Sequence, residues 1–267
     1  MRTRGEHALV TGATRGIGRA IAVELARRGA RLTIVSRTAE AVARVAAELG
    51  AHGVVADLAD VDGFDRLIAQ AVDAHGPVGI LVNNAGLNAP TALAYASAAS
   101  LRSQLITNLV APLELARAVL PSMVERDAGC IVNISSIAGD VAIPHQVPYC
   151  ATKAGLASAT RVLQRELRGT NVNALLVVLG LVATDMIREL SEDQVGAVIA
   201  KRFALFPELQ VDTVARHVID AIESRRRSLV LPRLVAPMHH LRLIPTRVID
   251  GLLAGVDVGR PPKVRNH

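Results

Sequence analysis

The chain has 267 residues, of which 51% are hydrophobic and 20% are charged, with 20 glycines placed among apolar segments. This composition is typical of a packed globular protein and excludes a disordered chain. A chain of this length can fold as one domain with a large core. We therefore expect one globular domain.

The formal charge of +6 comes from the end of the chain. Residues 225–267 contain nine Lys or Arg and two Asp or Glu, and the rest of the chain is close to neutral. Aromatic residues make up 2% of the chain and Trp is missing, so little is available to stack on single-stranded bases. We therefore expect no nucleic-acid partner.

The sequence predicts a cytoplasmic protein without a membrane-spanning segment. The N-terminus has no apolar stretch of signal-peptide length, and the apolar run at residues 174–183 falls short of the roughly 20 residues that a spanning helix needs. The two cysteines, Cys130 and Cys150, have neither metal-ligand spacing nor the pattern of a disulfide framework. Such cysteine usage suits a reducing compartment, and we expect no bound metal.

Strand-like and helix-like segments alternate along the chain. Short β-rich runs predict strands at residues 7–12, 31–36, 52–57, 78–86, 129–136, 171–180 and 228–232. Apolar residues at helical spacing predict helices at residues 17–29, 39–49, 61–75, 100–126 and 148–167. The alternation implies right-handed crossovers and a parallel sheet covered on both faces. The predicted fold is α/β, a doubly wound parallel sheet of the Rossmann type.

The segment TGATRGIG, Thr11 to Gly18, lies between the first predicted strand and the first predicted helix. Its glycines stand at 12, 16 and 18, which is neither the G-x-G-x-x-G fingerprint nor a phosphate-binding P-loop. Glycines at a strand-to-helix turn still let the backbone approach a pyrophosphate, and the helix offers free N–H groups there. The segment therefore predicts dinucleotide binding, against the alternative of a simple glycine-rich turn.

Tyr149 and Lys153 stand four residues apart in a predicted helix, so both side chains lie on one helical face. A phenol is a weak acid at neutral pH. A neighbouring ammonium would favour the phenolate and lower the pKa of the Tyr. The pair can therefore act in proton transfer, whereas the alternative is a surface Tyr beside a Lys with its stem packed on the protein.

Taken together, TGATRGIG, the NNAG that ends at Gly86, and Ser136 followed by Tyr149 and Lys153 resemble the short-chain dehydrogenase/reductase family in its short single-domain form. The resemblance covers residues 6–231 and carries motifs that are specific in this combination and order. It implies a dinucleotide-binding and catalytic domain at residues 1–231. It also implies hydride transfer between a nicotinamide cofactor and a carbonyl or alcohol.

By this resemblance four residues form the catalytic set. Tyr149 moves the proton, Ser136 holds the substrate oxygen, and Lys153 tunes Tyr149 and holds the nicotinamide ribose. Asn108 anchors a water that links Lys153 to solvent. Ser135 competes with Ser136 for the substrate role, but alternation along a strand points the two side chains to opposite sides, and the family spacing selects Ser136.

The resemblance also implies NADP(H) as the cofactor. Arg15 and Arg37 stand where NADP-binding members carry basic residues, and an acidic residue that would bind ribose hydroxyls is missing after the second strand. Two guanidiniums can clamp a 2′-phosphate with a hydroxyl from Ser36 or Thr38, unless both arginines are ordinary surface residues. Together with Tyr149 and Lys153, the predicted cofactor-binding residues are Gly12, Thr14, Arg15, Gly16, Ile17, Gly18, Ser36, Arg37, Asp57, Leu58, Asn84, Ala85, Gly86, Gly180, Val182 and Thr184.

One residue departs from the family pattern, and two segments beyond the sixth strand add to the prediction. Leu179 stands where the family usually has a Pro that stiffens the exit of the sixth strand. Residues 185–207 occupy the place of the substrate lid and are rich in apolar side chains, which predicts an apolar substrate.

Residues 232–267 form a basic amphipathic extension that can dock on the domain, contact another subunit, or lie on an anionic membrane. We expect a homodimer or homotetramer.

The sequence therefore predicts an NADP(H)-dependent oxidoreductase that interconverts a ketone and a secondary alcohol on an apolar small molecule. The alternative is a nucleotide-binding regulatory or scaffold protein of the same fold with weak turnover. The complete set of Asn108, Ser136, Tyr149 and Lys153 favours the enzyme, because a scaffold has little use for it.

Overall fold

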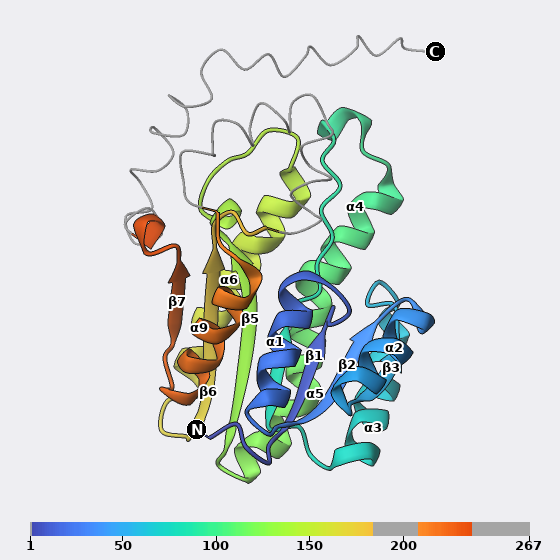
Figure 1. Ribbon diagram of the computed structural model, residues 1–267. Helices are drawn as coiled ribbons and strands as arrows, with labels where there is room; N and C mark the ends of the chain where they lie inside the picture. The colour runs from blue at the N-terminus through green and yellow to red at the C-terminus, as the bar shows by residue number, and fades with distance from the viewer. Residues whose placement is uncertain (1, 184–207, 237–267) are drawn as a thin grey trace.

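A computed structural model of the protein describes residues 2–183 and 208–236 (Figure 1). Thr184, the predicted lid at residues 185–207 and most of the predicted extension therefore lie outside the described residues. Within the described ranges, no helix is both long and apolar enough to cross a membrane.

Seven strands form one parallel sheet in the order β3-β2-β1-β4-β5-β6-β7. The strands are β1 (His7–Thr11), β2 (Arg31–Ser36), β3 (His52–Val55), β4 (Ile80–Asn83), β5 (Gly129–Ser136), β6 (Val172–Leu179) and β7 (Ser228–Leu231). After β3 the chain crosses to the other side of β1 to form β4. The direction of winding therefore reverses between the neighbouring strands β1 and β4. This reversal is the topological switch point at which open α/β sheets bind ligands.

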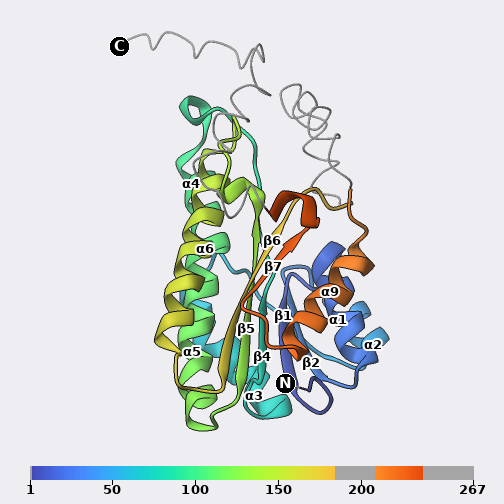
Figure 2. The ribbon, with the colours of Figure 1, turned by 90° about the vertical axis from the view of Figure 1, so that its left-hand side faces the viewer.

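Helices cover both faces of the sheet (Figure 2). They are α1 (Gly16–Arg27), α2 (Ala39–Leu49), α3 (Phe64–His75), α4 (Ala98–Leu105), α5 (Ala111–Glu125), α6 (Val147–Glu166) and α9 (Val211–Glu223). One core cluster joins α1 and α9 to the sheet through residues such as Ile21 and Val218, and another joins α3 and α5 through Leu67 and Leu115. The predicted doubly wound parallel sheet is confirmed.

The helix expected at residues 100–126 is interrupted. A π-helical segment, Ile106–Val110, separates α4 from α5 and carries Asn108. In an α-helix the Asn108 carbonyl would accept a hydrogen bond from the N–H of residue 112, but Pro112 has none. The regular ladder is therefore broken beside Asn108, at a type of helix irregularity that often marks functional sites.

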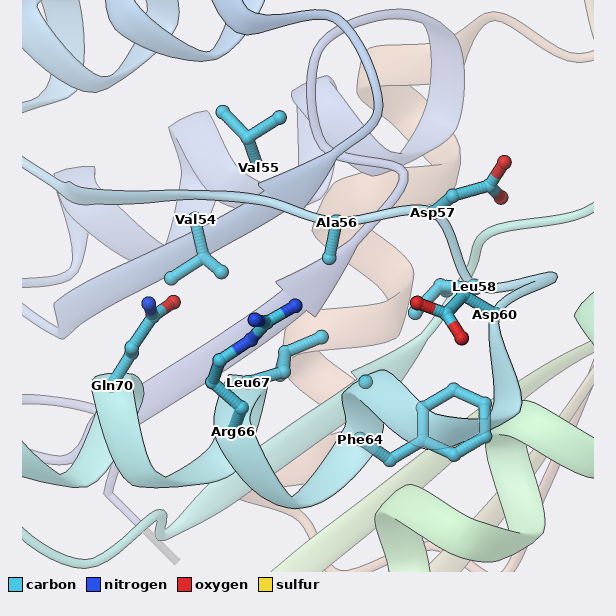
Figure 3. A pocket seen from close by; sticks show the side chains of 11 residues that line it. Val54, Val55, Ala56, Asp57, Leu58, Asp60, Phe64, Arg66, Leu67 and Gln70 are labelled. Carbon is cyan, nitrogen blue, oxygen red and sulfur yellow. The ribbon is translucent and has the colours of Figure 1, made fainter.

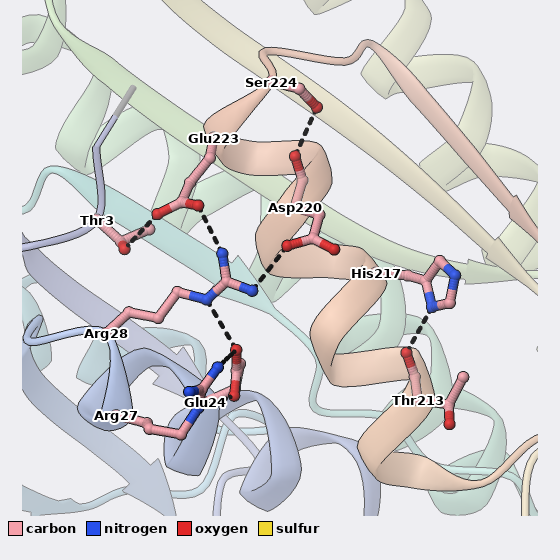
Figure 4. A network of polar contacts seen from close by, with 9 residues as sticks. All are labelled: Thr3, Glu24, Arg27, Arg28, Thr213, His217, Asp220, Glu223 and Ser224. Atoms are coloured by element: carbon pink, nitrogen blue, oxygen red, sulfur yellow. Dashed lines mark hydrogen bonds and ion pairs between the residues drawn. The ribbon is translucent and has the colours of Figure 1, made fainter.

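A network of charged side chains ties the end of α1 to α9 (Figure 4). The Arg28 guanidinium lies 2.7 Å from a Glu24 carboxylate oxygen, 2.7 Å from Asp220 and 2.5 Å from Glu223. Thr3 donates a hydrogen bond of 2.9 Å to Glu223, which adds the N-terminal segment. Because α1 begins at the glycine turn, anchoring its far end fixes the direction in which its N-terminus points.

Glu24 is held ionised inside this network. Hydrogen bonds from Arg27, and with them those from Arg28, lower the pKa of the Glu24 carboxyl to about 2 against the opposing effect of burial. A carboxyl whose pKa is lowered by folding stabilises the fold above its unfolded pKa, and loses that contribution as the pH falls toward the folded value. The network therefore stabilises the protein at neutral pH and weakens in acid.

We predict that Arg28→Met lowers the free energy of unfolding by about 1–3 kcal/mol at neutral pH, because it leaves the nearly buried Glu24 with fewer partners. Urea denaturation measures this loss, which should shrink as the pH is lowered from 5 toward 2. The matched control is Arg117→Met, since Arg117 pairs with Glu114 on the surface at 64% side-chain exposure. Equal stabilities of the two variants would contradict the role given to Arg28.

Candidate active site

The glycine turn after β1 is shaped for close approach of backbones. Gly12 and Gly16 have φ angles of +65° and +55°, which side chains rarely allow. A Cβ on Gly18 would collide with the Gly12 carbonyl and with the Asn84 amide. The turn therefore packs α1 tightly against the end of β1.

The N-terminus of α1 is suited to an anion. Its first turn contains no acidic residue, and the side chain of its N-cap residue, Arg15, makes no capping hydrogen bond. Free N–H groups and the positive end of the helix dipole therefore point out of the turn. A pyrophosphate is the kind of group that such a helix end binds.

Side chains lock the turn to the end of β4, across the switch point. Thr11 Oγ1 donates to the Val82 carbonyl (3.2 Å) and accepts from the Asn84 and Ala85 N–H groups (3.0 and 3.1 Å). Asn84 Nδ2 donates to the Thr11 and Gly12 carbonyls (3.0 and 3.2 Å). The Asn84 side chain thus holds the turn in place, and the Ala85 and Gly86 backbone follows it along the same edge.

The two basic positions predicted for a 2′-phosphate lie at the ends of neighbouring strands. Thr11 of β1 pairs with Val35 of β2, so the turn with Arg15 adjoins Arg37 directly after β2. Thr14 Oγ1 donates to Ser36 Oγ (3.0 Å), which joins the two turns. Both arginine side chains are exposed. The residues present therefore fit a phosphate at this edge.

Asp57 and Leu58 follow β3 at the rim of a pocket of about 250 Å³ between β3 and α3 (Figure 3). Leu58 is buried, and the exposed Asp57 carboxylate accepts a hydrogen bond from the Ala59 N–H (3.0 Å). In Figure 3 this carboxylate points away from Phe64 and Leu67. The pocket thus adjoins the position expected for adenine, and none of the predicted catalytic residues lines it.

Helix α6 packs beside β5 (Figure 2). Ser136 is the last residue of β5, and Tyr149 and Lys153 lie in the first two turns of α6. Lys153 is 5% exposed, and its Nζ donates to the Ile134 carbonyl (2.9 Å). The same Nζ lies 5.6 Å from the centroid of the Tyr149 ring. The Ser136 hydroxyl acts on the Tyr149 phenol as a hydrogen-bonding group that lowers its pKa. The structure therefore brings three of the predicted catalytic residues together.

Burial dominates the electrostatics of this group. It raises the pKa of Tyr149 to about 12, against the hydrogen bond from Ser136, and it lowers the pKa of Lys153 to about 8. The sequence-based expectation of a lowered Tyr149 pKa is thus wrong for the protein without a bound cofactor. Desolvation of the phenolate outweighs the effect of the neighbouring ammonium. Near neutral pH, Lys153 is still mostly charged and Tyr149 is neutral.

Asn108, the fourth predicted catalytic residue, lies in the π-helical segment and is 1% exposed. Its side chain accepts from the Leu87 N–H (2.7 Å) and donates to the Leu87 carbonyl (2.8 Å). A Cβ on Gly86 would lie 3.5 Å from Asn108 Oδ1 and 3.7 Å from Lys153 Nζ. Asn108 and Lys153 therefore flank the same glycine.

Two buried polar residues belong to this region although the sequence analysis did not select them. Thr152 Oγ1 donates to the Tyr149 carbonyl (2.8 Å) and accepts from Asn108 Nδ2 (3.3 Å), so it joins α6 to the π-helical segment. Asn133 accepts from Asn83 (2.9 Å) and donates to Thr160 (2.9 Å), beneath the site. For Asn133, a polar residue in an otherwise apolar strand was the available signal, whereas Thr152 lies in a helix and gave none.

Leu179, which replaces the family's usual Pro, is firmly placed. It is 3% exposed and pairs with Ser136 on one side and Leu231 on the other. Gly180 follows, and its N–H donates to the Leu231 carbonyl (2.7 Å). A Cβ on Gly180 would lie 3.0 Å from the Pro232 Cδ. Sheet pairing and the neighbouring Pro232 therefore fix the exit of β6 without a Pro at 179.

The remaining predicted cofactor residues lie just beyond β6. Val182 is 4% exposed and forms an isolated parallel bridge with Leu209. Its buried side chain leaves the backbone as the part of Val182 that a ligand could reach. Thr184 lies outside the described residues.

Comparisons with known proteins agree with this geometry. Residues 6–195 match the family model described as short chain dehydrogenase. The 3-oxoacyl-(acyl-carrier-protein) reductase FabG of Haemophilus influenzae is 34% identical over 74% of this chain and 82% of its own. The ketoacyl reductase HetN of Nostoc sp. is 35% identical over 85% of this chain and 78% of its own.

A solved structure resembles the fold as a whole. The crystal structure described as that of an NAD(P)-dependent gluconate 5-dehydrogenase from Beutenbergia cavernae, with NADP bound at low occupancy, matches with a TM-score of 0.76. It is 31% identical in sequence, and the match covers 85% of this chain and 95% of that one. The family model covers more than half of the chain, and the sequence motifs, the parallel sheet and the comparisons agree: the protein belongs to the short-chain dehydrogenase/reductase family of oxidoreductases.

Proposed function

We propose that the protein is an NADP(H)-dependent oxidoreductase that interconverts a ketone and a secondary alcohol on an apolar small molecule, with Tyr149 as the proton donor or acceptor. The observation that carries this proposal is the grouping of Ser136, Tyr149 and a buried, mostly charged Lys153 at the end of β5. Acid–base chemistry on a carbonyl oxygen needs a donor, an orienting hydroxyl and a positive charge in this arrangement.

The cofactor site extends along the carboxyl edge of the sheet. The N-terminus of α1 would hold the pyrophosphate, and Arg15 and Arg37 would hold the 2′-phosphate with help from Ser36. The solved relative with bound NADP supports this choice. Lys153 and the Ala85 and Gly86 backbone would adjoin the nicotinamide end. When bound, the cofactor supplies or accepts a hydride at the carbonyl carbon.

In the reducing direction, the Ser136 hydroxyl donates to the substrate carbonyl oxygen and orients it. Tyr149 transfers its proton to that oxygen as the hydride reaches the carbon, which leaves an alcohol and a phenolate. The Lys153 ammonium stabilises the phenolate. We infer that a water held near Asn108 and Lys153 returns the proton from solvent.

The apolar substrate is inferred from residues 185–207, which lie outside the described residues. The relatives named as 3-oxoacyl and ketoacyl reductases suggest 3-oxoacyl thioesters as the first compounds to assay, beside neutral apolar ketones and polar sugar acids. We further propose a cytoplasmic homodimer or homotetramer in which residues 1–231 form the catalytic domain. The extension at residues 232–267 would dock on that domain or on another subunit.

Cofactor choice gives the first test. Arg37→Asp should raise the Kd for NADPH by about tenfold or more and narrow the preference over NADH, because it replaces a phosphate-binding cation with an anion. Calorimetric titration of both cofactors measures this, and Arg117→Asp is a control at an arginine remote from the site. Tighter binding of NADH than NADPH by the unaltered protein would sink the cofactor assignment.

Turnover gives the second test. Tyr149→Phe should lower kcat for reduction by about a thousandfold or more, because it removes the proton donor, and should leave the NADPH Kd within about twofold. NADPH oxidation over a panel of carbonyl compounds measures kcat, and calorimetry measures Kd. Activity of Tyr149→Phe close to that of the unaltered protein would refute the role of Tyr149. If the unaltered protein binds NADPH but reduces no carbonyl, the scaffold alternative holds instead.

A further inference from the structure

Two groups of Lys153 attach helix α6 to the end of β5. One is the Lys153 ammonium, and the other is the Lys153 main-chain carbonyl. Ser135, the residue before the substrate-orienting Ser136, is 2% exposed and lies on the opposite side of the strand. Its Oγ donates to the Lys153 carbonyl (3.0 Å), and this hydrogen bond is buried. Ser135 therefore contacts the backbone of the residue whose side chain binds the neighbouring Ile134 carbonyl.

Gly139 makes a second contact at the same point of α6. A Cβ at this position would lie 2.8 Å from the Lys153 carbonyl carbon, 2.8 Å from the Ala154 nitrogen and 3.0 Å from the Lys153 oxygen. These distances are shorter than ordinary van der Waals contact, and the atoms belong to a helix backbone that cannot rotate away. Any side chain at 139 would therefore push α6 away from β5.

We propose that Ser135 and Gly139 are positioning residues that fix α6 at Lys153, so that the buried ammonium stays between the Ile134 carbonyl and the Tyr149 ring. This proposal rests on the proposed function, in which Lys153 stabilises the Tyr149 phenolate. It assigns Ser135 a task on the far side of the strand from the substrate.

The need for such a fixing contact follows from the distances involved. The Lys153 Nζ holds the Ile134 carbonyl at 2.9 Å and lies 5.6 Å from the Tyr149 ring centroid. Hydrogen bonds weaken steeply beyond their optimal length, and the interaction of two charges falls with their separation. A shift of α6 by about one ångström would thus change the electrostatic interaction between the Lys153 ammonium and the Tyr149 phenol. A long, flexible Lys stem cannot prevent such a shift by itself.

The chain allows a direct test, because it contains three lysines in total. With ¹³C-labelled lysine, the side-chain ε-carbon shift of each lysine reports its own titration, and Lys153→Met identifies the Lys153 signal. Burial places the pKa of Lys153 at about 8, well apart from an ordinary lysine. The measurement needs neither cofactor nor turnover, so it remains decisive if the proposed function fails.

Ser135→Ala should raise the Lys153 pKa by about half a unit or more, because a loosened ammonium gains water. Ser135→Thr keeps the hydroxyl and should restore the original titration. Thr33→Val is the matched control: it removes a buried hydroxyl of β2, which is hydrogen-bonded to His7 Nε2 (2.9 Å), away from α6, and should leave the Lys153 titration unchanged. Gly139→Ala should shift Lys153 in the same direction as Ser135→Ala.

Kinetics give the second readout. Ser135→Ala should lower kcat by about tenfold and move the pH profile of kcat, while the KM of the carbonyl substrate changes less than about twofold. A Lys153 titration that is the same in Ser135→Ala as in the unaltered protein would overturn the inference, and so would an equal shift in Thr33→Val. Absence of turnover in the unaltered protein would instead overturn the proposed function.

Discussion

The structure depends on one buried charge. The Lys153 ammonium is almost fully removed from solvent, and it rests on the Ile134 carbonyl beside the face of the Tyr149 ring. Burying an ammonium is costly unless hydrogen bonds and neighbouring π-electrons compensate it. Here the compensation requires a fixed distance between the end of β5 and the second turn of α6. Buried hydrogen bonds such as that from Ser135 to the Lys153 carbonyl keep this distance.

The same burial explains why the protein's own groups do not complete the acid–base site. Tyr149 holds its proton up to a pKa of about 12, and Lys153 loses its charge as the pH rises through about 8. Below about pH 8 the pair is therefore a phenol beside an ammonium, and above that value it is a phenol beside a neutral amine. A phenolate at neutral pH therefore needs a further positive charge, and the oxidised nicotinamide of the proposed cofactor carries one. In the proposed reaction, proton transfer by Tyr149 thereby depends on the presence of the cofactor.

The two ends of the sheet have different roles: one carries the proposed binding site and the other anchors the helices. At the carboxyl edge of the sheet, turns held by Thr11, Asn84 and Ser36 present backbone N–H groups and arginines. At the opposite end, Arg28 ties α1 to α9 and so fixes the helix whose N-terminus is proposed to hold the pyrophosphate. The site is therefore built from short loops whose positions are set by long, well-anchored elements.

Local patterns predicted most of the fold and the family motifs. The strand at residues 129–136 and the helix at 39–49 have the bounds that periodicity gave, and four-residue spacing placed Tyr149 near Lys153. The break beside Asn108 was readable from Pro112 but was missed, because the apolar pattern continues through it.

Other features depend on how distant elements pack, which local patterns do not contain. The bond from Ser135 to the Lys153 carbonyl requires the register of α6 on β5. The hydrogen bonds from the Asn84 side chain to the Thr11 and Gly12 carbonyls form only because the end of β4 lies beside the glycine-rich turn. The raised Tyr149 pKa requires the depth of burial, which spacing along a helix does not give.

The central claim is that Tyr149 becomes an effective acid and base through the combined charges of Lys153 and the oxidised cofactor. Tyr149 and Tyr95 are the two tyrosines of a chain without Trp, and Tyr95 is 55% exposed, so Tyr95→Phe leaves Tyr149 as the single phenol that absorbs in the near ultraviolet. A pH titration of phenolate absorbance in this variant should show the midpoint falling by about two units or more when NADP⁺ is bound. A midpoint that NADP⁺ leaves unchanged would contradict the account.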